Sequence, residues 1–301
     1  MINKIIKKIN STLRIYRSDI QTKGVYWAVI HRLFKISFIK LVLIPIVNFL
    51  KPDYVMIQNH KLFIDKWDEV VSQELLLSGK WEEYETELFK KHINKGDVVL
   101  DIGAHIGYYT LIAARSVGNK GKVYAFEPDL KNFKLLKKNV EENKYKNVVL
   151  VNKAVTDISG EVNLFINRKN TGDHRIYDSG GKRKTIGIQA IRLDDFFKNK
   201  TKRIDLIKMD IQGSEALAFK GGLRLIKENR NIKILTEFWP HGLKLSGSSA
   251  QEYAKLLKGN MFQIYDIDEN EKTIKLIYLK TLLEPFRSKT HDYKYLFCIR
   301  N

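Results

Sequence analysis

Cysteine and long uncharged apolar runs are what the 301-residue sequence most clearly lacks. The single cysteine, Cys298, excludes a disulfide framework and any zinc site built on paired cysteines. A membrane-spanning helix needs roughly 18 consecutive apolar residues, and the most apolar stretch, Leu41 to Leu50, is interrupted by Pro45. The first apolar run without charges comes only after Lys40, which argues against a secretory signal. We therefore expect a cytoplasmic protein without a spanning helix.

Acidic residues are also scarce, above all near the N-terminus. The chain has 53 Lys and Arg residues against 34 Asp and Glu residues, a net charge of +19, and residues 1–52 contain ten basic residues and one acidic residue, Asp19. The apolar residues of this segment recur at helical spacing, which predicts a basic amphipathic helical region over 1–52. Such a region can lie on the anionic inner face of a membrane or pack on the rest of the protein. The basic excess is also compatible with nucleic acid, an acidic substrate or a solvated lysine-rich surface.

The rest of the chain mixes strand and helix patterns. Residues 53–95 predict an α/β extension with two short strands around Asn59-His60 and a helix over 81–93. Buried strands then alternate with helices over 96–301, which predicts a mainly parallel sheet covered on both faces. Residues 161–192 interrupt this alternation and predict an inserted β-hairpin with a polar tip at 167–184. Core strands are expected near 98–102, 123–126, 148–151, 204–209, 232–238, 262–267 and 293–299, and one continuous helix is expected over 214–227.

Acidic residues stand at the ends of two consecutive predicted strands. Asp101 precedes Gly103 and Gly107 in the pattern D-x-G-x-x-x-G, which opens a helix, and glycines there let backbone approach a ligand closely. A carboxylate would repel the pyrophosphate that the pattern G-x-G-x-x-G binds, which disfavours an NAD-dependent oxidoreductase. Glu127 ends the next strand, where a carboxylate can accept both ribose hydroxyls. Each acid alone is also explained as a capping residue, but together they indicate a cationic nucleoside without phosphates, S-adenosylmethionine.

Candidate catalytic groups lie at the ends of later core strands. Methyl transfer from a sulfonium is an in-line displacement that depends on positioning, and a positioned base typically contributes 10²–10⁴-fold. Asp210 is a candidate for cofactor ligand, base or metal ligand, although we assign no metal site. Glu237 is a candidate base. His241 is either a catalytic residue or a histidine of a surface loop.

Acceptor contacts are expected from two other segments. The polar hairpin tip contains Asp173 and His174, which either reach the site or belong to an ordinary exposed loop. Trp81, together with Tyr84, either stacks on the acceptor or packs in the core.

Several segments of the sequence resemble those of the FkbM family of S-adenosylmethionine-dependent methyltransferases. The resemblance is strong over residues 97–240, extends from about residue 69 to the C-terminus, and does not cover residues 1–50. It departs from the family pattern at Gln212, where the family often has Glu. The matching segments are 99–110, Phe126-Glu127-Pro128, Leu193-Asp194-Asp195-Phe196, Ile207-Lys208-Met209-Asp210-Ile211-Gln212-Gly213-Ser214-Glu215, Gly221-Gly222 and Thr236-Glu237-Phe238.

This resemblance implies a Rossmann-like class I fold, with a mainly parallel seven-stranded sheet and helices on both faces. It implies S-adenosylmethionine as cofactor, S-adenosylhomocysteine as product, and O-methylation of a sugar hydroxyl in a glycan or glycolipid. Carried over to this sequence, Asp101, Gly103 and Gly107 would hold the methionine end of the cofactor. Glu127 would hold the ribose, and Asp210 would face the methyl region.

Two other functions stay open. A nucleic-acid methyltransferase would fit the net charge, but amino-group methylation commonly uses an Asp/Asn-Pro-Pro-aromatic tetrad where this chain has Asp210-Ile211-Gln212-Gly213. The sequence also lacks an aromatic RNA-binding motif, so we expect no specific nucleic-acid partner. The other alternative is a non-catalytic protein that binds a membrane or a partner through its basic N-terminal region, which the intact acidic strand ends oppose.

Overall fold

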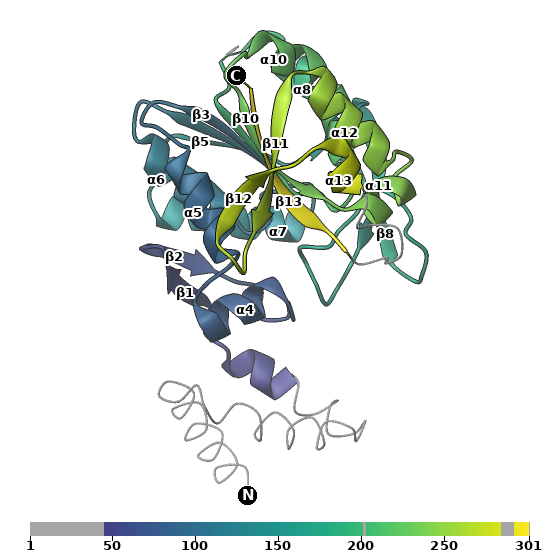
Figure 1. Cartoon of the computed structure of the whole chain (residues 1–301). Helices are drawn as coiled ribbons and strands as arrows, with labels where there is room; N and C mark the ends of the chain where they lie inside the picture. Colours follow the sequence, from purple (N-terminus) through teal and green to yellow (C-terminus); the bar gives the residue numbers. More distant parts are fainter. Residues whose placement is uncertain (1–44, 201–202, 284–291, 301) are drawn as a thin grey trace, which may run out of the picture. The chain divides into compact units, whose positions relative to one another are not determined.

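The computed structural model describes residues 45–200, 203–283 and 292–300 (Figure 1). The chain separates into two compact units, residues 1–52 and 53–301. In the first unit only a short helix over 45–50 and the two residues that follow it are described, so that the predicted basic helical region falls almost wholly outside the described residues. Among the helices that are described, none combines the length and the apolar character needed to cross a bilayer.

The second unit begins with the predicted α/β extension. Strands β1 (Tyr54–Ile57) and β2 (His60–Phe63) pair antiparallel around the two-residue turn Gln58-Asn59. Both turn residues have positive φ, which matches the twist of a tight hairpin. Helices α4 (Val71–Ser78) and α5 (Glu83–Lys91) follow, and α5 runs from acidic to basic residues as its dipole favours. The two predicted strands and the predicted helix are confirmed.

A mainly parallel, eight-stranded sheet forms the centre of this unit (Figure 1). In spatial order its strands are β12 (Thr273–Leu276), β11 (Phe262–Asp268), β13 (Lys294–Arg300), β10 (Lys233–Phe238), β9 (Leu206–Met209), β3 (Val98–Ile102), β4 (Lys122–Phe126) and β5 (Val148–Val151). The strands from β10 to β5 run parallel, whereas β13 is antiparallel to both of its neighbours. The predicted Rossmann-like sheet is confirmed. It has eight strands rather than seven because β12 pairs with β11 as an additional edge strand.

Helices cover both faces of the sheet. Those after residue 100 are α6 (Tyr108–Val117), α7 (Leu130–Glu142), α8 (Leu193–Phe196), α9 (Glu215–Gly221), α10 (Leu223–Glu228), α11 (Pro240–Leu245), α12 (Ala250–Gly259) and α13 (Leu279–Leu283). The prediction of one continuous helix over 214–227 is wrong, because the helix is divided at Gly222 into α9 and α10. A Cβ at Gly221 would lie 2.0 Å from the carbonyl oxygen of Thr156. This close approach of another backbone segment is a tertiary contact that helical periodicity does not reveal.

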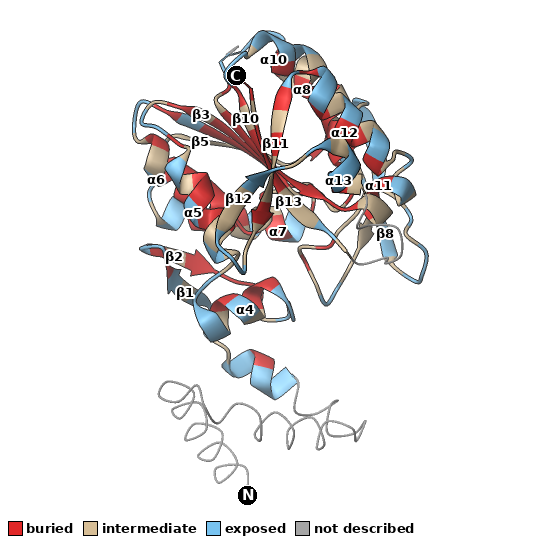
Figure 2. Ribbon diagram, in the orientation of Figure 1, coloured by how far each residue is buried: buried red, intermediate tan, exposed pale blue. Residues whose placement is uncertain are grey.

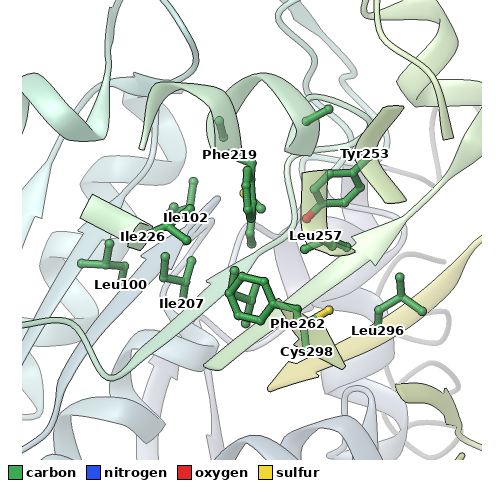
Figure 3. Close-up of a cluster of buried hydrophobic side chains, with 14 of the residues drawn as sticks. Leu100, Ile102, Ile207, Phe219, Ile226, Tyr253, Leu257, Phe262, Leu296 and Cys298 are labelled. Atoms are coloured by element: carbon green, nitrogen blue, oxygen red, sulfur yellow. The ribbon is translucent and has the colours of Figure 1, made fainter. Parts of the chain in front are cut away.

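Alternate residues of the core strands pack into two different apolar clusters. Leu100 and Ile207 belong to the cluster that also contains Phe219 of α9 and Tyr253 of α12 (Figure 3). Residues of the opposite parity pack with α5, α6 and α7 in the second cluster. The central strands are therefore buried on both faces, as Figure 2 shows by their colour.

The interruption after β5 is the predicted insertion. Strands β7 (Gly160–Ile166) and β8 (Lys184–Ile191) form an antiparallel hairpin, and β6 (Ala154–Val155) pairs parallel to β8. The three strands make a separate small sheet. The segment between β7 and β8, which we call the hairpin tip (167–183), turns back toward the main sheet and contributes to the site described next.

Candidate active site

A pocket lies at the carboxyl ends of β3, β4 and β9. Gly103 and Glu127 line it from the loops after β3 and β4, and Asp210 lines it from the end of β9. The hairpin tip contributes Thr171 and His174. The chain runs from β3 outward through β4 and β5 and returns to β9 on the other side of β3. The pocket therefore occupies the topological switch point, where open α/β sheets bind ligands.

The glycines after β3 allow close packing at the pocket floor. Gly103 has φ +82, and a Cβ there would lie 2.1 Å from the carbonyl oxygen of Asp210, so that only glycine fits. Gly107 has φ +96, and a Cβ there would lie 2.7 Å from Leu136 Cδ1 of α7. Gly107 is absent from the pocket lining. Its role in the structure is to start α6 against α7, and its predicted contact with the cofactor stays a prediction.

Glu127 is held in one orientation by two backbone N–H groups. His105 N donates to Glu127 Oε2 at 2.8 Å, and Asp129 N donates to Oε1 at 2.9 Å. The side chain is buried, and burial is the main reason that its pKa rises to about 8. A buried carboxyl at the end of β4, in the pocket wall, is where the sequence predicts the ribose contact.

Asp101 lies on the α6 side of β3 rather than in the pocket lining. Only 1% of the residue is exposed, and Thr110 Oγ1 donates to its Oδ2 at 2.5 Å. Its other oxygen has no hydrogen-bond partner among the described residues. Burial is the main cause of the raised pKa of this carboxyl. The structure thus brings Asp101 near the site without exposing it, and a direct contact with the methionine end stays a prediction.

Asp210 presents a carboxylate to the pocket with both oxygens anchored. Lys208 Nζ lies 3.2 Å from Asp210 Oδ2, and Gln212 Nε2 donates to Oδ1 at 3.0 Å. Gln212 has a left-handed backbone, φ +55, and its carbonyl accepts a 2.5 Å hydrogen bond from the Tyr177 hydroxyl of the hairpin tip. Backbone strain of this kind is concentrated at functional sites. The side-chain amide of this residue is the one that donates to Asp210.

Gln212 also connects Asp210 to Glu237. Its amide nitrogen lies 3.5 Å from Glu237 Oε1, while Glu237 Oε2 has no partner among the described residues. Burial, followed by the charge of Asp210, raises the pKa of Glu237 well above its ordinary value. The third predicted catalytic residue, His241, lies on α11 with its ring 5.7 Å from that of Trp239, and it is absent from the pocket lining. The structure therefore brings Asp210 and Glu237 together and leaves His241 apart.

The predicted acceptor residues are placed differently from one another. His174 lines the pocket, and its Nδ1 accepts a hydrogen bond from Asn167 N at 3.1 Å. Asp173 is occupied by two ion pairs, with Arg175 at 2.6 Å and Arg183 at 2.7 Å. Trp81 is absent from the pocket lining, and its carbonyl accepts from Thr86 Oγ1 at 3.0 Å. Of these three residues, His174 alone lines the pocket.

The hairpin tip forms hydrogen bonds with three other segments of the chain. Thr171 N donates to Asp68 Oδ1 at 3.0 Å, Asn132 Nδ2 of α7 donates to the Thr171 carbonyl at 2.9 Å, and Thr171 Oγ1 shares a 2.8 Å hydrogen bond with His105 Nε2. His105 has a left-handed backbone, φ +50. These contacts close the tip over the pocket.

Sequence reasoning missed Lys208 and Glu82. Lys208 interrupts an otherwise apolar strand, and this interruption is the signal that a search for charged residues within core strands would have found. Glu82 gives no comparable signal, because it stands in an acidic run at the start of α5. Among the described residues, no group of three His, Cys, Asp or Glu side chains is arranged to hold a metal ion.

The chain matches a family model described as the methyltransferase FkbM domain over residues 101–269, more than half of its length. The chain belongs to the FkbM methyltransferase family. This confirms the family predicted from the sequence, and with it a methyltransferase domain that uses S-adenosylmethionine. The match begins at Asp101 and includes the acidic strand end Glu127, the insertion and the segment around Asp210.

Two curated relatives are similar to part of the chain. A protein named "Probable cobalt-precorrin-6B C(15)-methyltransferase (decarboxylating)" from Saccharolobus solfataricus is 37% identical over 98 residues, which are 32% of this chain and 46% of that protein. Its namesake from Sulfurisphaera tokodaii is 33% identical over 135 residues, 42% of this chain and 70% of that protein. The chain thus spans about half the length of the first of these relatives.

Solved structures show more distant similarity. A SAM-dependent O-methyltransferase from Thermotoga maritima has 13% identity and a TM-score of 0.40, with 75% of this chain and 69% of that chain covered. Precorrin-6y C5,15-methyltransferase from Geobacter metallireducens has 12% identity and a TM-score of 0.43, with 83% and 100% covered. Similarity at this level concerns the fold alone.

Proposed function

We propose that this protein transfers the methyl group of S-adenosylmethionine to a hydroxyl group, most specifically that of a sugar in a glycan or glycolipid. The observation that carries the proposal is the pocket at the switch point, with Glu127 at one strand end and Asp210 at another. Glu127 would accept the ribose hydroxyls, and Asp210 would face the sulfonium and its methyl group. The choice of a sugar rests on the resemblance to the family.

The reaction needs one bond to form and one to break. The acceptor oxygen attacks the methyl carbon, the carbon–sulfur bond breaks, and the products are a methyl ether and S-adenosylhomocysteine. The hydroxyl proton must pass to a base. Asp210 lines the pocket at the end of β9, and the Gln212 side chain connects it to Glu237. A positioned carboxylate of this kind is the residue type that deprotonates a hydroxyl.

A neutral acceptor suits the charge of the site better than a polyanion does. Asp210, Glu237 and Glu82 lie at the same end of the sheet, and the electrostatic interactions of Glu82 with Asp210 and of Asp210 with Glu237 place them within reach of one another. The arginines of the hairpin tip, Arg175 and Arg183, are paired with Asp173. The Asp210 carboxylate in the pocket lining would repel the phosphates on which nucleic-acid affinity depends. We therefore favour a sugar hydroxyl over nucleic acid.

The first test is calorimetric titration of the protein with S-adenosylhomocysteine, in wild type, Glu127→Gln and Asp210→Asn. The second is transfer of the labelled methyl group from S-adenosylmethionine to neutral glycosides and glycolipids, with total RNA as the competing acceptor. We expect micromolar binding in the wild type, weaker binding in Glu127→Gln, and little change in Asp210→Asn, because S-adenosylhomocysteine lacks the sulfonium charge. We expect label in the glycosides or glycolipids. A folded wild type that binds no S-adenosylhomocysteine would refute the proposal. Label in RNA alone would replace the sugar acceptor with the nucleic-acid alternative.

A further inference from the structure

Lys208 is a charged residue in the centre of the sheet. It belongs to β9 and is 4% exposed, and strand neighbours of its parity pack in the apolar cluster beside α5 and α6. A buried ion pair is weak support for stability, because apolar side chains of similar volume often stabilise such a position equally well or better. Packing therefore does not explain Lys208, and the groups around its ammonium must be considered.

The Lys208 ammonium faces carboxylates from several elements. It lies 3.2 Å from Asp210 Oδ2 and 4.6 Å from the centre of the Tyr109 ring of α6. Asp101 is directly opposite Lys208 in the register of β3 and β9. Burial lowers the pKa of Lys208, but the surrounding carboxylates outweigh it and leave the pKa above the ordinary value. We call the following set the Lys208 cluster: Lys208, Asp101, Asp210, Glu82, Glu85, Glu237, Tyr109 and Tyr295.

The N-terminal extension supplies one side of the Lys208 cluster. Glu82 has a left-handed backbone, φ +43, and its carboxyl accepts hydrogen bonds from Tyr109 at 3.0 Å and from Tyr295 of β13. Glu85 is 0% exposed, and neither of its oxygens has a partner among the described residues. Burial is the main reason that the pKa of Glu82 rises to about 7. Lys208 is thus held between carboxyls of the extension and the one carboxylate of the cluster that lines the pocket, Asp210.

We propose that Lys208 is a positioning residue of the methyl-transfer site, which fixes the Asp210 carboxylate in the pocket and joins it to the extension. This inference rests on the proposed function, because it takes Asp210 as the group that faces the sulfonium. Without the ammonium, Asp210 Oδ2 loses its partner and faces the other carboxyls of the cluster uncompensated. The carboxylate then turns away from its place in the pocket, and its attraction for the sulfonium falls.

The test compares two ligands that differ in one charge. Calorimetry at pH 8 gives the Kd of S-adenosylhomocysteine and of S-adenosylmethionine, which also carries the sulfonium charge, and their ratio measures discrimination. The proteins are wild type, Lys208→Met, Asp210→Asn and the double variant. Lys208→Arg, which keeps the charge, is the rescue variant. Lys220→Met is the matched control, because Lys220 pairs with Glu252 on the surface of α9.

We expect Lys208→Met to lower the preference for S-adenosylmethionine about tenfold, as Asp210→Asn does, and the double variant to lower it no further. Lys208→Arg should restore the ratio to within about threefold, and Lys220→Met should leave it unchanged. If Lys208 were only a nearby positive charge, its removal would raise the preference for the cationic ligand. A raised or unchanged ratio, or effects that multiply in the double variant, would overturn the inference.

Two further measurements keep the outcomes separable. Thermal unfolding shows whether Lys208→Met folds. If it does not, Lys208→Gln, which keeps a hydrogen-bond donor, replaces it, and the same ratio of the two Kd values is expected. A wild type that binds neither ligand refutes the proposed function and this inference with it. A wild type that binds both, with a Lys208 variant that behaves as the surface control does, refutes only the role of Lys208.

Discussion

Glu127→Gln is expected to weaken binding of S-adenosylhomocysteine strongly at high pH and little at low pH. Glu127 is buried with two backbone N–H groups on its oxygens, and burial raises its pKa to about 8. The ribose would donate two hydroxyl hydrogens, which favours the ionised carboxylate. A bound ligand therefore lowers the pKa, so that wild-type affinity falls as the pH drops below 8.

The magnitude follows from hydrogen-bond energies. A hydrogen bond to a charged group contributes about 1 kcal/mol more than one to a neutral group. With two ribose hydroxyls, the glutamine variant should therefore lose about 2 kcal/mol of binding free energy at pH 9, which raises the Kd about 30-fold. Below pH 8 the wild type must also lose a proton to bind. Its affinity should then fall by up to about tenfold per pH unit, and the two proteins should converge near pH 6.5.

Calorimetry with S-adenosylhomocysteine at pH 6, 7, 8 and 9 measures both profiles. The glutamine variant is its own control for titration of the ligand, because only the difference between the two profiles belongs to Glu127. Stability without ligand gives an independent check. The pKa of Glu127 in the folded protein lies above the ordinary 4.5, so the free energy of unfolding of the wild type should fall as the pH rises from about 4.5 to 8. Glu127→Gln should not show this loss. Wild-type affinity that does not change from pH 6 to 9, or full affinity of the variant at pH 9, would refute the reasoning.

Three other variants or probes test separate parts of the structure. Gly103→Ala should cost at least about 3 kcal/mol in stability or abolish ligand binding, because the added Cβ would lie 2.1 Å from the Asp210 carbonyl oxygen. The control Gly259→Ala, whose Cβ would have nothing within 4 Å, should do neither. Equal melting temperatures and ligand affinities of the two variants would contradict this prediction. Thr171→Val should raise the Kd of S-adenosylhomocysteine about fivefold by removing the hydrogen bond to His105, and the exposed Thr185→Val serves as the control in the same titration. Cys298 is fully buried with a raised thiol pKa, so a maleimide should label it only on unfolding; rapid labelling of the folded protein, followed by mass spectrometry, would show that β13 is not held as described.

Local sequence patterns predict the parts of the site that depend on consecutive residues. The D-x-G-x-x-x-G turn marks the pocket because the close backbone approach at Gly103 needs glycine. The acidic end of the next strand marks it because Glu127 lies in the pocket lining. The side of the sheet to which Asp101 points is a different matter. β3 is buried on both faces, so its apolar residues carry no alternation that would distinguish one face from the other.

Contacts between distant segments explain the rest of what the sequence does not reveal. The Lys208 cluster joins Glu82 to Lys208 and Tyr295, which are far apart in sequence and come together only when α5 packs on the sheet. Helix α9 ends at Gly221, which lies so close to the Thr156 backbone that a Cβ there would collide with it. In both cases the deciding partner lies outside any window in which helical or strand periodicity is measured.

The position of β13 has a consequence for the order in which the sheet is completed. β13 lies between β10 and β11, although both of these strands precede it in the chain. During synthesis, β10 and β11 therefore emerge first, each with one edge that has no partner until residues 294–300 arrive. Unpaired edges of apolar strands invite association with other chains. The interval between synthesis of β11 and insertion of β13 is thus the period in which the nascent chain most needs protection from aggregation.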